Sequence, residues 1–250
     1  IIILDEECKM QYAVQRAIIL AAGRGKRLRP LTDKCPKPLL EVKGKPIIEH
    51  TIEAMISRGI KEILIVTGYK HKKFDYLVSK YSGKAFIVTN QRWKESNLTS
   101  MHCALPYMHV DASVAVMLVD GDTIIKPEAI KQKVSHSMYC YTDETDACEW
   151  SMKLDKSGKI IEVIEDLSEK KSFHALRSFS YWAGNELAAF RFGIQYAHDS
   201  KLQPPYYDNI ALLGVNEGLR NLYGCRVSKN DFVEIDTIAD IESAEKRTDL

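Results

Sequence analysis

The stretch QRAIILAAGRG, residues 15–25, decides the fold predicted for this chain. Its apolar run from Ala17 ends at a glycine, and a short continuous run of this kind is typical of a buried strand. Gly23 and Gly25 come directly after the run. A Gly-x-Gly after the first strand lets backbone N–H groups approach phosphate oxygens closely. We therefore expect a buried strand that leads into an anion-binding loop.

Outward from this stretch, short apolar runs alternate with amphipathic segments. Strands are predicted at 62–66, 85–89 and 113–119, and helices at 46–58, 71–81, 97–108 and 127–136. Such alternation predicts an α/β, Rossmann-like, doubly wound and mostly parallel sheet with right-handed crossovers. Ligands of such sheets bind outside the carboxyl ends of the strands, which places the chemistry just after residues 21, 66, 89 and 119.

The pattern changes near residue 137. Strands joined by turns are predicted at 138–141, 149–154, 159–165 and 177–183, then helices at 186–198 and 208–221. Strands near 222–227 and 232–235 and a helix over 237–250 follow. We expect antiparallel additions to the sheet in this second half. The domain organisation predicted is an N-terminal extension, 1–14, before a single domain, 15–250.

The overall composition excludes several classes of protein. Lys and Arg number 35 against 34 Asp and Glu, which argues against a nucleic-acid coat. The apolar runs 17–22 and 114–119 are far shorter than the roughly 20 residues that span a bilayer, so no membrane insertion is expected. Six cysteines without a C-x-x-C pair indicate reduced thiols in a cytoplasmic protein. The first residue is not Met, which leaves additional domains in a longer chain open.

Positive charge is concentrated just after the first strand. Residues 24–45 hold eight Lys and Arg against two acids in a chain whose net charge is +1. Such a field suits a polyanion such as a triphosphate, although a basic loop in solvent would have the same composition. Neither the third glycine of a Rossmann fingerprint nor a P-loop Gly-Lys-Ser/Thr is present.

The whole string LAAGRGKRLRPLT at 20–32, followed by PKPL at 36–39, closely resembles the signature of the nucleotidyltransferases that make nucleoside-diphosphate sugars and alcohols. The resemblance implies that the glycine loop wraps the nucleotide triphosphate, with Arg27 on the β- and γ-phosphates. Lys37 would stabilise charge on the α-phosphate, so Arg27 and Lys37 are the expected catalytic residues. The expected nucleotide-binding residues are Leu20, Ala21, Ala22, Gly23, Gly25, Arg27, Asn90, Asn97, Ser100 and Asp120.

Asn90, Asn97 and Ser100 lie where the family reads base and ribose, although polar residues at a helix start are also common caps. In the same way, the resemblance divides the chain into a nucleotide-binding part, about 15–136, an acceptor-binding part, about 137–236, and the C-terminal helix.

Two aspartates are expected to bind Mg²⁺ as the cofactor. Asp122 matches the Gly-Asp motif of the family after the fourth strand, and Asp236 stands in a strand-to-helix turn near the C terminus. Carboxylates at a strand end commonly hold Mg²⁺ against substrate phosphates. Asp120 could assist or only cap the turn, and Asp236 could also serve as a helix N-cap.

The later segments look most like the CTP-using phosphocholine cytidylyltransferases. This resemblance implies an aromatic and acidic cage for a quaternary ammonium, although such aromatic residues are also common in cores. The expected acceptor-binding residues are Trp150, Trp182, Tyr206, Tyr207 and Asp208.

The function expected is Mg-dependent transfer of CMP from CTP to phosphocholine, giving CDP-choline and pyrophosphate. The same cage would also accept 2-aminoethylphosphonate or phosphoethanolamine as the small cationic phosphate or phosphonate substrate. A sugar-1-phosphate nucleotidyltransferase, a regulatory nucleotide-binding module and a nucleic-acid-binding domain are the other hypotheses. No nucleic-acid partner is expected from the overall charge.

Overall fold

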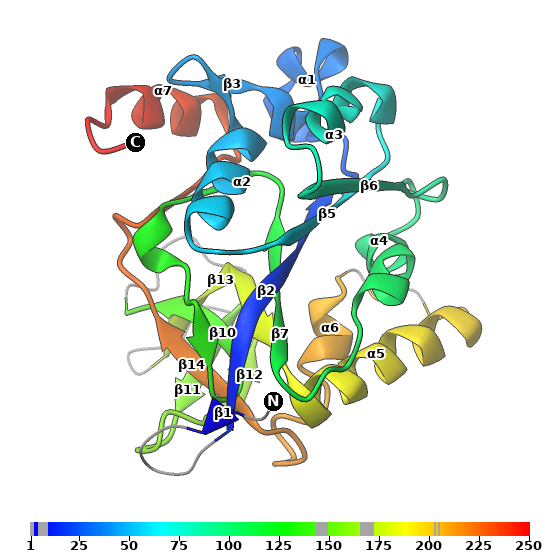
Figure 1. The fold of residues 1–250 in the computed structure, drawn as a ribbon, viewed down its shortest axis with the longest axis vertical. Helices are drawn as coiled ribbons and strands as arrows, with labels where there is room; N and C mark the ends of the chain where they lie inside the picture. The colour runs from blue at the N-terminus through cyan, green and yellow to red at the C-terminus, as the bar shows by residue number, and fades with distance from the viewer. Residues whose placement is uncertain (1–2, 5–9, 144–149, 166–172, 203, 205) are drawn as a thin grey trace.

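A parallel sheet forms the centre of the molecule, seen as a ribbon in Figure 1. The computed structural model describes residues 3–4, 10–143, 150–165, 173–202, 204 and 206–250. Strand β2 (Met10–Ala21) lies between β7 (Val114–Asp120) and β5 (Glu62–Thr67), and β6 (Ala85–Thr89) follows β5. All three pairings within the order β7-β2-β5-β6 are parallel. The predicted α/β class with a mostly parallel sheet is confirmed.

The second half of the chain extends this sheet with antiparallel strands, as predicted. Strand β13 (His174–Trp182) pairs antiparallel with β7, and β11 (Ser151–Leu154) and β12 (Ile160–Ile164) continue beyond it. Strand β10 (Ser137–Thr142) pairs antiparallel with β13 and parallel with β14 (Leu222–Arg226). Two short strands, β1 (Ile3–Leu4) and β9 (Lys133–Val134), pair with β2.

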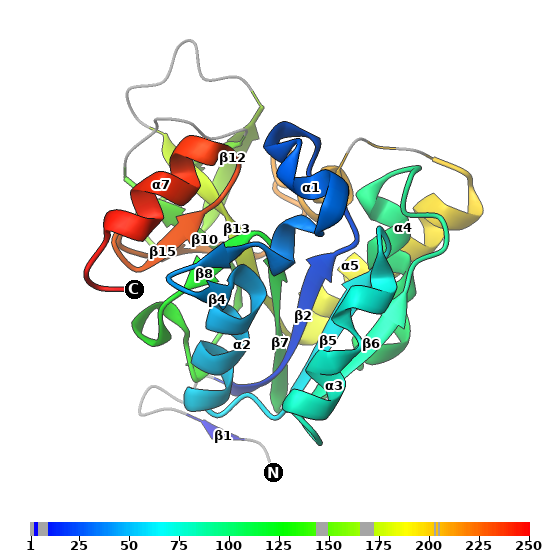
Figure 2. The ribbon, with the colours of Figure 1, turned by 90° about the horizontal axis from the view of Figure 1, so that it is seen from above.

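Helices cover both faces of the sheet because successive strand residues point to opposite sides. Ile19 of β2 packs in the core cluster that includes α2 (Ile47–Ser57) and α3 (Tyr76–Lys80). Its neighbour Ile18 packs in the opposite cluster, with α4 (Asn97–Ala104), α5 (Gly184–Asp199) and α6 (Asp208–Ala211). Figure 2 shows α2 and α3 on one side of the strands and α4 and α5 on the other.

The C-terminal segment returns to the carboxyl edge of the sheet. Strand β15 (Phe232–Glu234) pairs antiparallel with β8 (Thr123–Ile125), and α7 (Ile238–Lys246) follows. A small core cluster joins this segment to the loop after β2 through Leu28, Ile124 and Ile235. That loop contains α1 (Leu31–Lys34), β3 (Glu41–Val42), β4 (Lys45–Pro46) and 3-10 turns at Lys26–Leu28 and Lys37–Leu39. Figure 1 shows α1 and α7 at the same, upper end of the molecule.

Several predicted boundaries were wrong. The helix predicted at 127–136 is a 3-10 turn, Pro127–Ala129, followed by β9, because residues 133–134 pair with the exposed edge of β2. The helix predicted at 208–221 stops at Ala211, and two glycines with positive φ follow, at 214 and 218. The segments 71–81 and 97–108 each divide into an α-helix and a 3-10 turn, the latter at His71–Phe74 and Leu105–Tyr107.

The N-terminal boundary also differs from the prediction. Strand β2 starts at Met10, so residues 10–14 belong to the central strand rather than to an extension. Glu149, predicted to enter a strand, lies outside the described residues, and β11 begins at Ser151. None of the helices in the described part of the chain combines the length and the apolar character needed to cross a membrane.

Candidate active site

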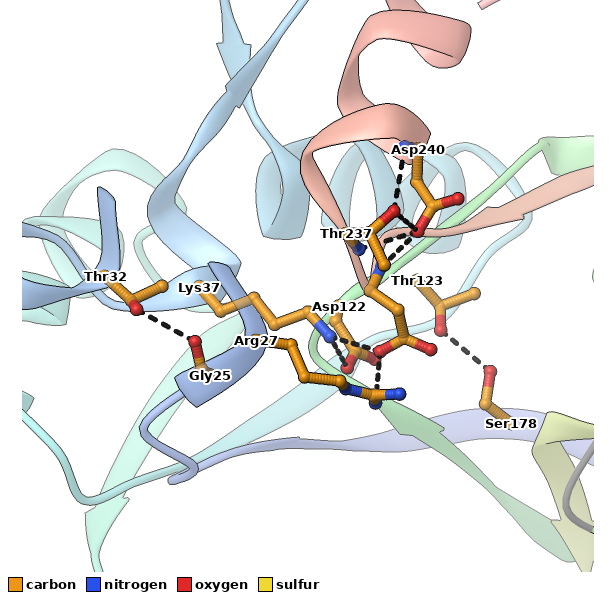
Figure 3. Close-up of polar contacts among 10 residues, drawn as sticks. Gly25, Arg27, Thr32, Lys37, Asp122, Thr123, Ser178, Thr237 and Asp240 are labelled. Atoms are coloured by element: carbon orange, nitrogen blue, oxygen red, sulfur yellow. Dashed lines mark hydrogen bonds and ion pairs between the residues drawn. The ribbon is translucent and has the colours of Figure 1, made fainter. Parts of the chain in front are cut away.

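The glycine loop leaves the end of β2 in a conformation that glycine permits. Gly25 has φ +64, and a Cβ placed on it would lie 2.8 Å from Cβ of Lys37. The hydroxyl of Thr32 donates to the carbonyl oxygen of Gly25 at 2.8 Å (Figure 3). Leu28, a residue of the same loop, is fully buried. The loop is therefore anchored on both sides and packs directly against Lys37.

Lys37 lies between two carboxylates. Its Nζ donates to Oδ2 of Asp122 at 2.6 Å and to Oδ1 of Asp236 at 2.7 Å (Figure 3). Only 9% of the side chain is exposed. Burial by itself lowers the pKa of the Lys37 ammonium, but the charges and hydrogen bonds of the two aspartates outweigh burial and raise the pKa above its ordinary value. The side chain is therefore a fixed positive charge at neutral pH.

Asp122 reaches Lys37 because the turn after β7 packs tightly on the end of β2. The Gly121 amide donates to the Leu20 carbonyl at 2.9 Å. A Cβ at Gly121 would lie 3.0 Å from Cβ of Ala21 and 3.1 Å from Cγ of Pro38. A side chain at position 121 would therefore be tight against both neighbours, and glycine lets the turn lie close to them.

Asp236 is brought to the same point from the far end of the chain. The Ile235 amide donates to the Asp122 carbonyl at 3.0 Å, next to the β15–β8 pairing. Thr237 and Asp240 form a capping box, so Thr237, rather than Asp236, is the N-cap of α7. The Asp236 amide donates to Oδ2 of Asp240 at 2.9 Å, which leaves its carboxylate aimed at the basic groups.

Arg27 completes the charged cluster. Its guanidinium donates to Oδ1 of Asp236 at 2.6 Å, the same oxygen that binds Lys37. The side chain is 64% exposed. The arginine is therefore free to turn toward a ligand in a way that the buried lysine is not.

These groups open into a cavity of about 750 Å³. The predicted residues that line it are Leu20, Ala21, Gly23, Gly25, Arg27, Lys37, Asp122, Tyr206 and Asp236. Residues that line it without having been predicted are Arg24, Lys26, Pro38, Trp93 and Lys94. Arg24 and Lys26 were already part of the basic stretch. Trp93 and Lys94 follow β6, one of the strand ends at which ligands were expected, and their position was the signal that could have found them.

The predicted nucleotide-binding residues Asn90, Asn97 and Ser100 are not among the residues that line the cavity. Asn90 is buried, and its Nδ2 donates to the hydroxyls of Thr99 and Ser100 at 2.9 and 3.0 Å. Oδ1 of Asn97 accepts from the Tyr207 amide at 2.7 Å. These contacts hold the start of α4 and the segment before α6, so the structure gives these polar groups a positioning role.

Ala22 and Asp120 also lie outside the residues that line the cavity. Ala22 is buried, and its carbonyl accepts from the Tyr69 amide at 3.0 Å. Asp120, the last residue of β7, lies beside Leu20. Burial, and then the negative charges of neighbouring carboxylates, chiefly Asp122 and Asp208, raise the pKa of Asp120 well above its ordinary value.

Only part of the predicted acceptor cage faces the cavity. Trp182 is fully buried, its ring stacks on Phe190 at 4.3 Å, and its Nε1 donates to Oγ of Ser180 at 2.9 Å. Tyr207 is 3% exposed in the same core. Both are core residues because the antiparallel strands and α5 enclose them, and neither lines the cavity, so their contact with the acceptor stays a prediction.

Trp150, Tyr206 and Asp208 lie closer to the surface. Trp150 is partly buried and packs against the core cluster that contains Tyr207. Tyr206 is 39% exposed and lines the cavity. Oδ1 of Asp208 accepts a hydrogen bond of 2.9 Å from the hydroxyl of Tyr139, which is itself buried.

The donor set can hold a hard cation only with help from a ligand. Within the described ranges, no group of three or more His, Cys, Asp and Glu residues is arranged for a metal ion. Asp122 and Asp236 nevertheless present two partly exposed carboxylates that already converge on one positive charge. Mg²⁺ is usually bound by one or two carboxylates together with substrate phosphates and water. The pair fits Mg²⁺ on these terms.

Comparison with known proteins agrees with the geometry. The chain is 29% identical over 234 residues to a choline-phosphate cytidylyltransferase of Streptococcus pneumoniae, covering 92% of this chain and 97% of the relative. It is 33% identical over 178 residues, 70% of each chain, to a 2-aminoethylphosphonate cytidylyltransferase of Lancefieldella rimae. The solved CTP:phosphocholine cytidylyltransferase of Streptococcus pneumoniae superposes with a TM-score of 0.79 at 28% identity, over 94% of this chain and 98% of that one.

The nucleotidyl transferase family matches residues 16–174, which include the glycine loop, Lys37 and Asp122. With the sheet order and the Lys37 cluster in place, the chain belongs to the nucleotidyl transferase family and is a nucleotidyltransferase.

Proposed function

We propose that the protein transfers CMP from CTP to a small cationic phosphoester, phosphocholine first, and releases pyrophosphate. The observation that carries the proposal is the Lys37 ammonium held between Asp122 and Asp236 at the foot of the glycine loop. The two relatives that act on choline phosphate and 2-aminoethylphosphonate support a cationic acceptor. Both are cytidylyltransferases, which supports CTP as the donor.

The reaction is a displacement at the α-phosphorus of CTP. An oxygen of the acceptor phosphate forms a new bond to that phosphorus, and the bond to the β-phosphate oxygen breaks. The acceptor oxygen is already ionised near neutral pH, so no general base is needed. The site has to position the two anions in line and neutralise charge on the α-phosphate and on the departing pyrophosphate.

Arg27 and Lys37 differ in exposure, and we assign them to different phosphates. Backbone N–H groups of the glycine loop bind the triphosphate, and the buried Lys37 lies at the α-phosphate. The exposed Arg27 binds the β- and γ-phosphates, which become pyrophosphate. Asp122 and Asp236 would hold Mg²⁺ when the nucleotide is bound. Bound there, the ion supplies positive charge against the phosphate oxygens.

Negative charge and one exposed ring favour a cationic acceptor. Tyr206 lines the cavity, and an ammonium over its face gains roughly 0.5–2 kcal/mol. The nearby carboxylate of Asp208 is oriented by Tyr139. Asp208 is partly buried, so water screens its charge incompletely. An ammonium group pairs with such a carboxylate, whereas an uncharged sugar ring does not.

The decisive experiment measures pyrophosphate release with each of CTP, UTP, ATP and GTP. Each is combined with phosphocholine, 2-aminoethylphosphonate, phosphoethanolamine or glucose-1-phosphate. We expect the highest kcat/KM for CTP with phosphocholine. A higher kcat/KM with 2-aminoethylphosphonate would identify the phosphonate as the acceptor. A preference for glucose-1-phosphate would reject a cationic acceptor.

Two variants test the acceptor side. Tyr206→Ala should raise the KM for phosphocholine much more than the KM for CTP. Tyr139→Phe, which removes only the hydroxyl that binds Asp208, should raise the same KM by a smaller factor. Tyr107→Ala is the matched control, because Tyr107 is similarly exposed and does not line the cavity. Equal effects on CTP and acceptor would reject this placement.

A further inference from the structure

Trp93 forms a part of the cavity wall that the phosphate chemistry does not explain. The indole is partly buried and lines the cavity with Lys94. It lies directly on Gly68, where a Cβ would be 2.5 Å from Cβ of Trp93 and 2.9 Å from its Cγ. The same Cβ would lie 2.9 Å from the Ala22 carbonyl oxygen. The ring therefore packs on Gly68, which itself lies beside Ala22 at the start of the glycine loop.

A series of contacts ties Trp93 to the phosphate-binding loop. Its ring lies 5.4 Å from the ring of Tyr69, at an interplanar angle of 60°. The Tyr69 hydroxyl donates to the Thr32 carbonyl at 3.0 Å, and Thr32 in turn binds the Gly25 carbonyl. The indole is thus held in place before any ligand binds, which reduces the entropy lost on binding.

The order of the strands places Trp93 at one end of the cavity. In the order β7-β2-β5-β6, Asp122 follows β7 and Trp93 follows β6, so the two lie on opposite sides of the loop after β2. Lys37 and the two aspartates mark the reacting end, where the α-phosphate lies. A nucleotide whose phosphates lie along the glycine loop then has its base toward β5 and β6.

We infer that Trp93 stacks on the pyrimidine base of the bound nucleotide. This inference rests on the proposed use of CTP. An indole among the cations Arg24, Lys26 and Lys94 gains nothing from phosphate, but every base offers an aromatic face. The Lys94 ammonium already lies 5.6 Å from the Trp93 ring centroid, which disfavours the cationic acceptor at this wall. Trp93 is therefore assigned to the nucleotide and not to the acceptor.

Calorimetric titration of two ligands tests the inference. Trp93→Ala should weaken CTP binding by roughly ten- to hundredfold, the usual loss for one stacked base. Inorganic tripolyphosphate should bind this variant as it binds the wild type, because it has no base. Trp93→Phe should keep most of the CTP affinity, since it keeps a ring. Unchanged CTP affinity in Trp93→Ala, or an equal loss for tripolyphosphate, would overturn the assignment.

Intrinsic fluorescence provides a readout that survives any loss of stability in the alanine variant. CTP should quench the emission of the wild type and of Trp182→Phe, and should leave that of the folded Trp93→Phe unchanged. Quenching retained in Trp93→Phe would contradict stacking. A wild-type protein that binds no CTP would contradict the proposed function instead. A loss of phosphocholine affinity without a loss of CTP affinity would assign the indole to the acceptor and overturn the inference.

Discussion

The Nζ atom of Lys37 lies 2.6 Å from Oδ2 of Asp122, although 85 positions separate the two residues in the chain. The contact joins the loop after the first parallel strand of the core to the turn after the fourth, because β2 and β7 are adjacent in the sheet. Asp236 reaches the same ammonium from the C-terminal segment. One buried cation therefore organises three distant parts of the chain at the mouth of the cavity.

Lys37→Met is expected to lower kcat for pyrophosphate release by roughly 100- to 1000-fold. One preorganised charge of this kind is worth about 3–4 kcal/mol in a transition state. The fold should persist, because Asp122 and Asp236 are partly exposed and Arg27 still pairs with Asp236. Lys34→Ala, on an exposed lysine of the same loop, is the control. Wild-type turnover with an unchanged melting temperature in Lys37→Met would exclude a catalytic lysine.

Asp122→Asn and Asp236→Asn are each expected to shift the Mg²⁺ dependence of activity to higher concentration. Each change removes one of only two converging carboxylates, so productive binding should weaken and partly recover in excess Mg²⁺. Activity titrations with MgCl₂ at saturating CTP measure the shift. Asp75→Asn, on an exposed aspartate outside the cavity, should titrate as the wild type does. A wild-type titration curve for either site variant removes that residue from the metal site.

Gly23 and Gly25 should respond differently to alanine. At Gly25 the positive φ costs about 1–2 kcal/mol for an L-residue, and the new Cβ would overlap Cβ of Lys37, so Gly25→Ala should lower the free energy of unfolding. A Cβ at Gly23 meets no atom within 4 Å. Gly23→Ala should therefore keep the stability and weaken CTP binding roughly tenfold, because it keeps the phosphates away from the backbone. Chemical denaturation measures the stability of both variants, and calorimetry measures their CTP affinity. A stability loss in Gly23→Ala with none in Gly25→Ala would contradict these roles of the two glycines.

Asp240→Asn is expected to lower the free energy of unfolding by roughly 0.3–1 kcal/mol at pH 7, through the first turn of α7. Burial by itself raises the pKa of Asp240, but hydrogen bonds from the Asp236 and Thr237 amides outweigh burial and lower the pKa below its ordinary value of 3.8. A carboxyl whose folded-state pKa is lowered stabilises the fold fully above its unfolded value. This contribution is lost as the pH falls through the lower folded-state pKa.

The difference between wild type and Asp240→Asn should therefore be constant above about pH 5 and shrink as the pH falls below 3.8. Urea denaturation at a series of pH values measures it. Glu242→Gln, on an exposed residue of the same helix, is the matched control and should show a smaller difference at every pH. A difference for Asp240→Asn that grows toward acid pH would contradict the capping role.

Local patterns in the sequence were sufficient for the central strands and for the phosphate loop. Continuous apolar runs predicted β5, β6 and β7 almost to the residue. In β5 and β7 nearly every residue is buried, which requires apolar side chains on both faces of the strand. The helices at 127–136 and 208–221 were wrong for a physical reason. Both segments have a composition that permits a helix. In the first, residues 133–134 instead pair with β2, and in the second, two glycines with positive φ end the helix.

The sequence by itself determined the parallel sheet and the glycine loop, since these follow from patterns within short segments, and the resemblance to the nucleotidyltransferases singled out Lys37, Asp122 and Asp236. Only the tertiary structure decided which side chains share the cavity. Trp182 and Tyr207 lie in the core, whereas Trp93 lines the cavity. Whether an aromatic ring is covered depends on which strands and helices pack over it, and that packing is set by contacts between residues far apart in the sequence.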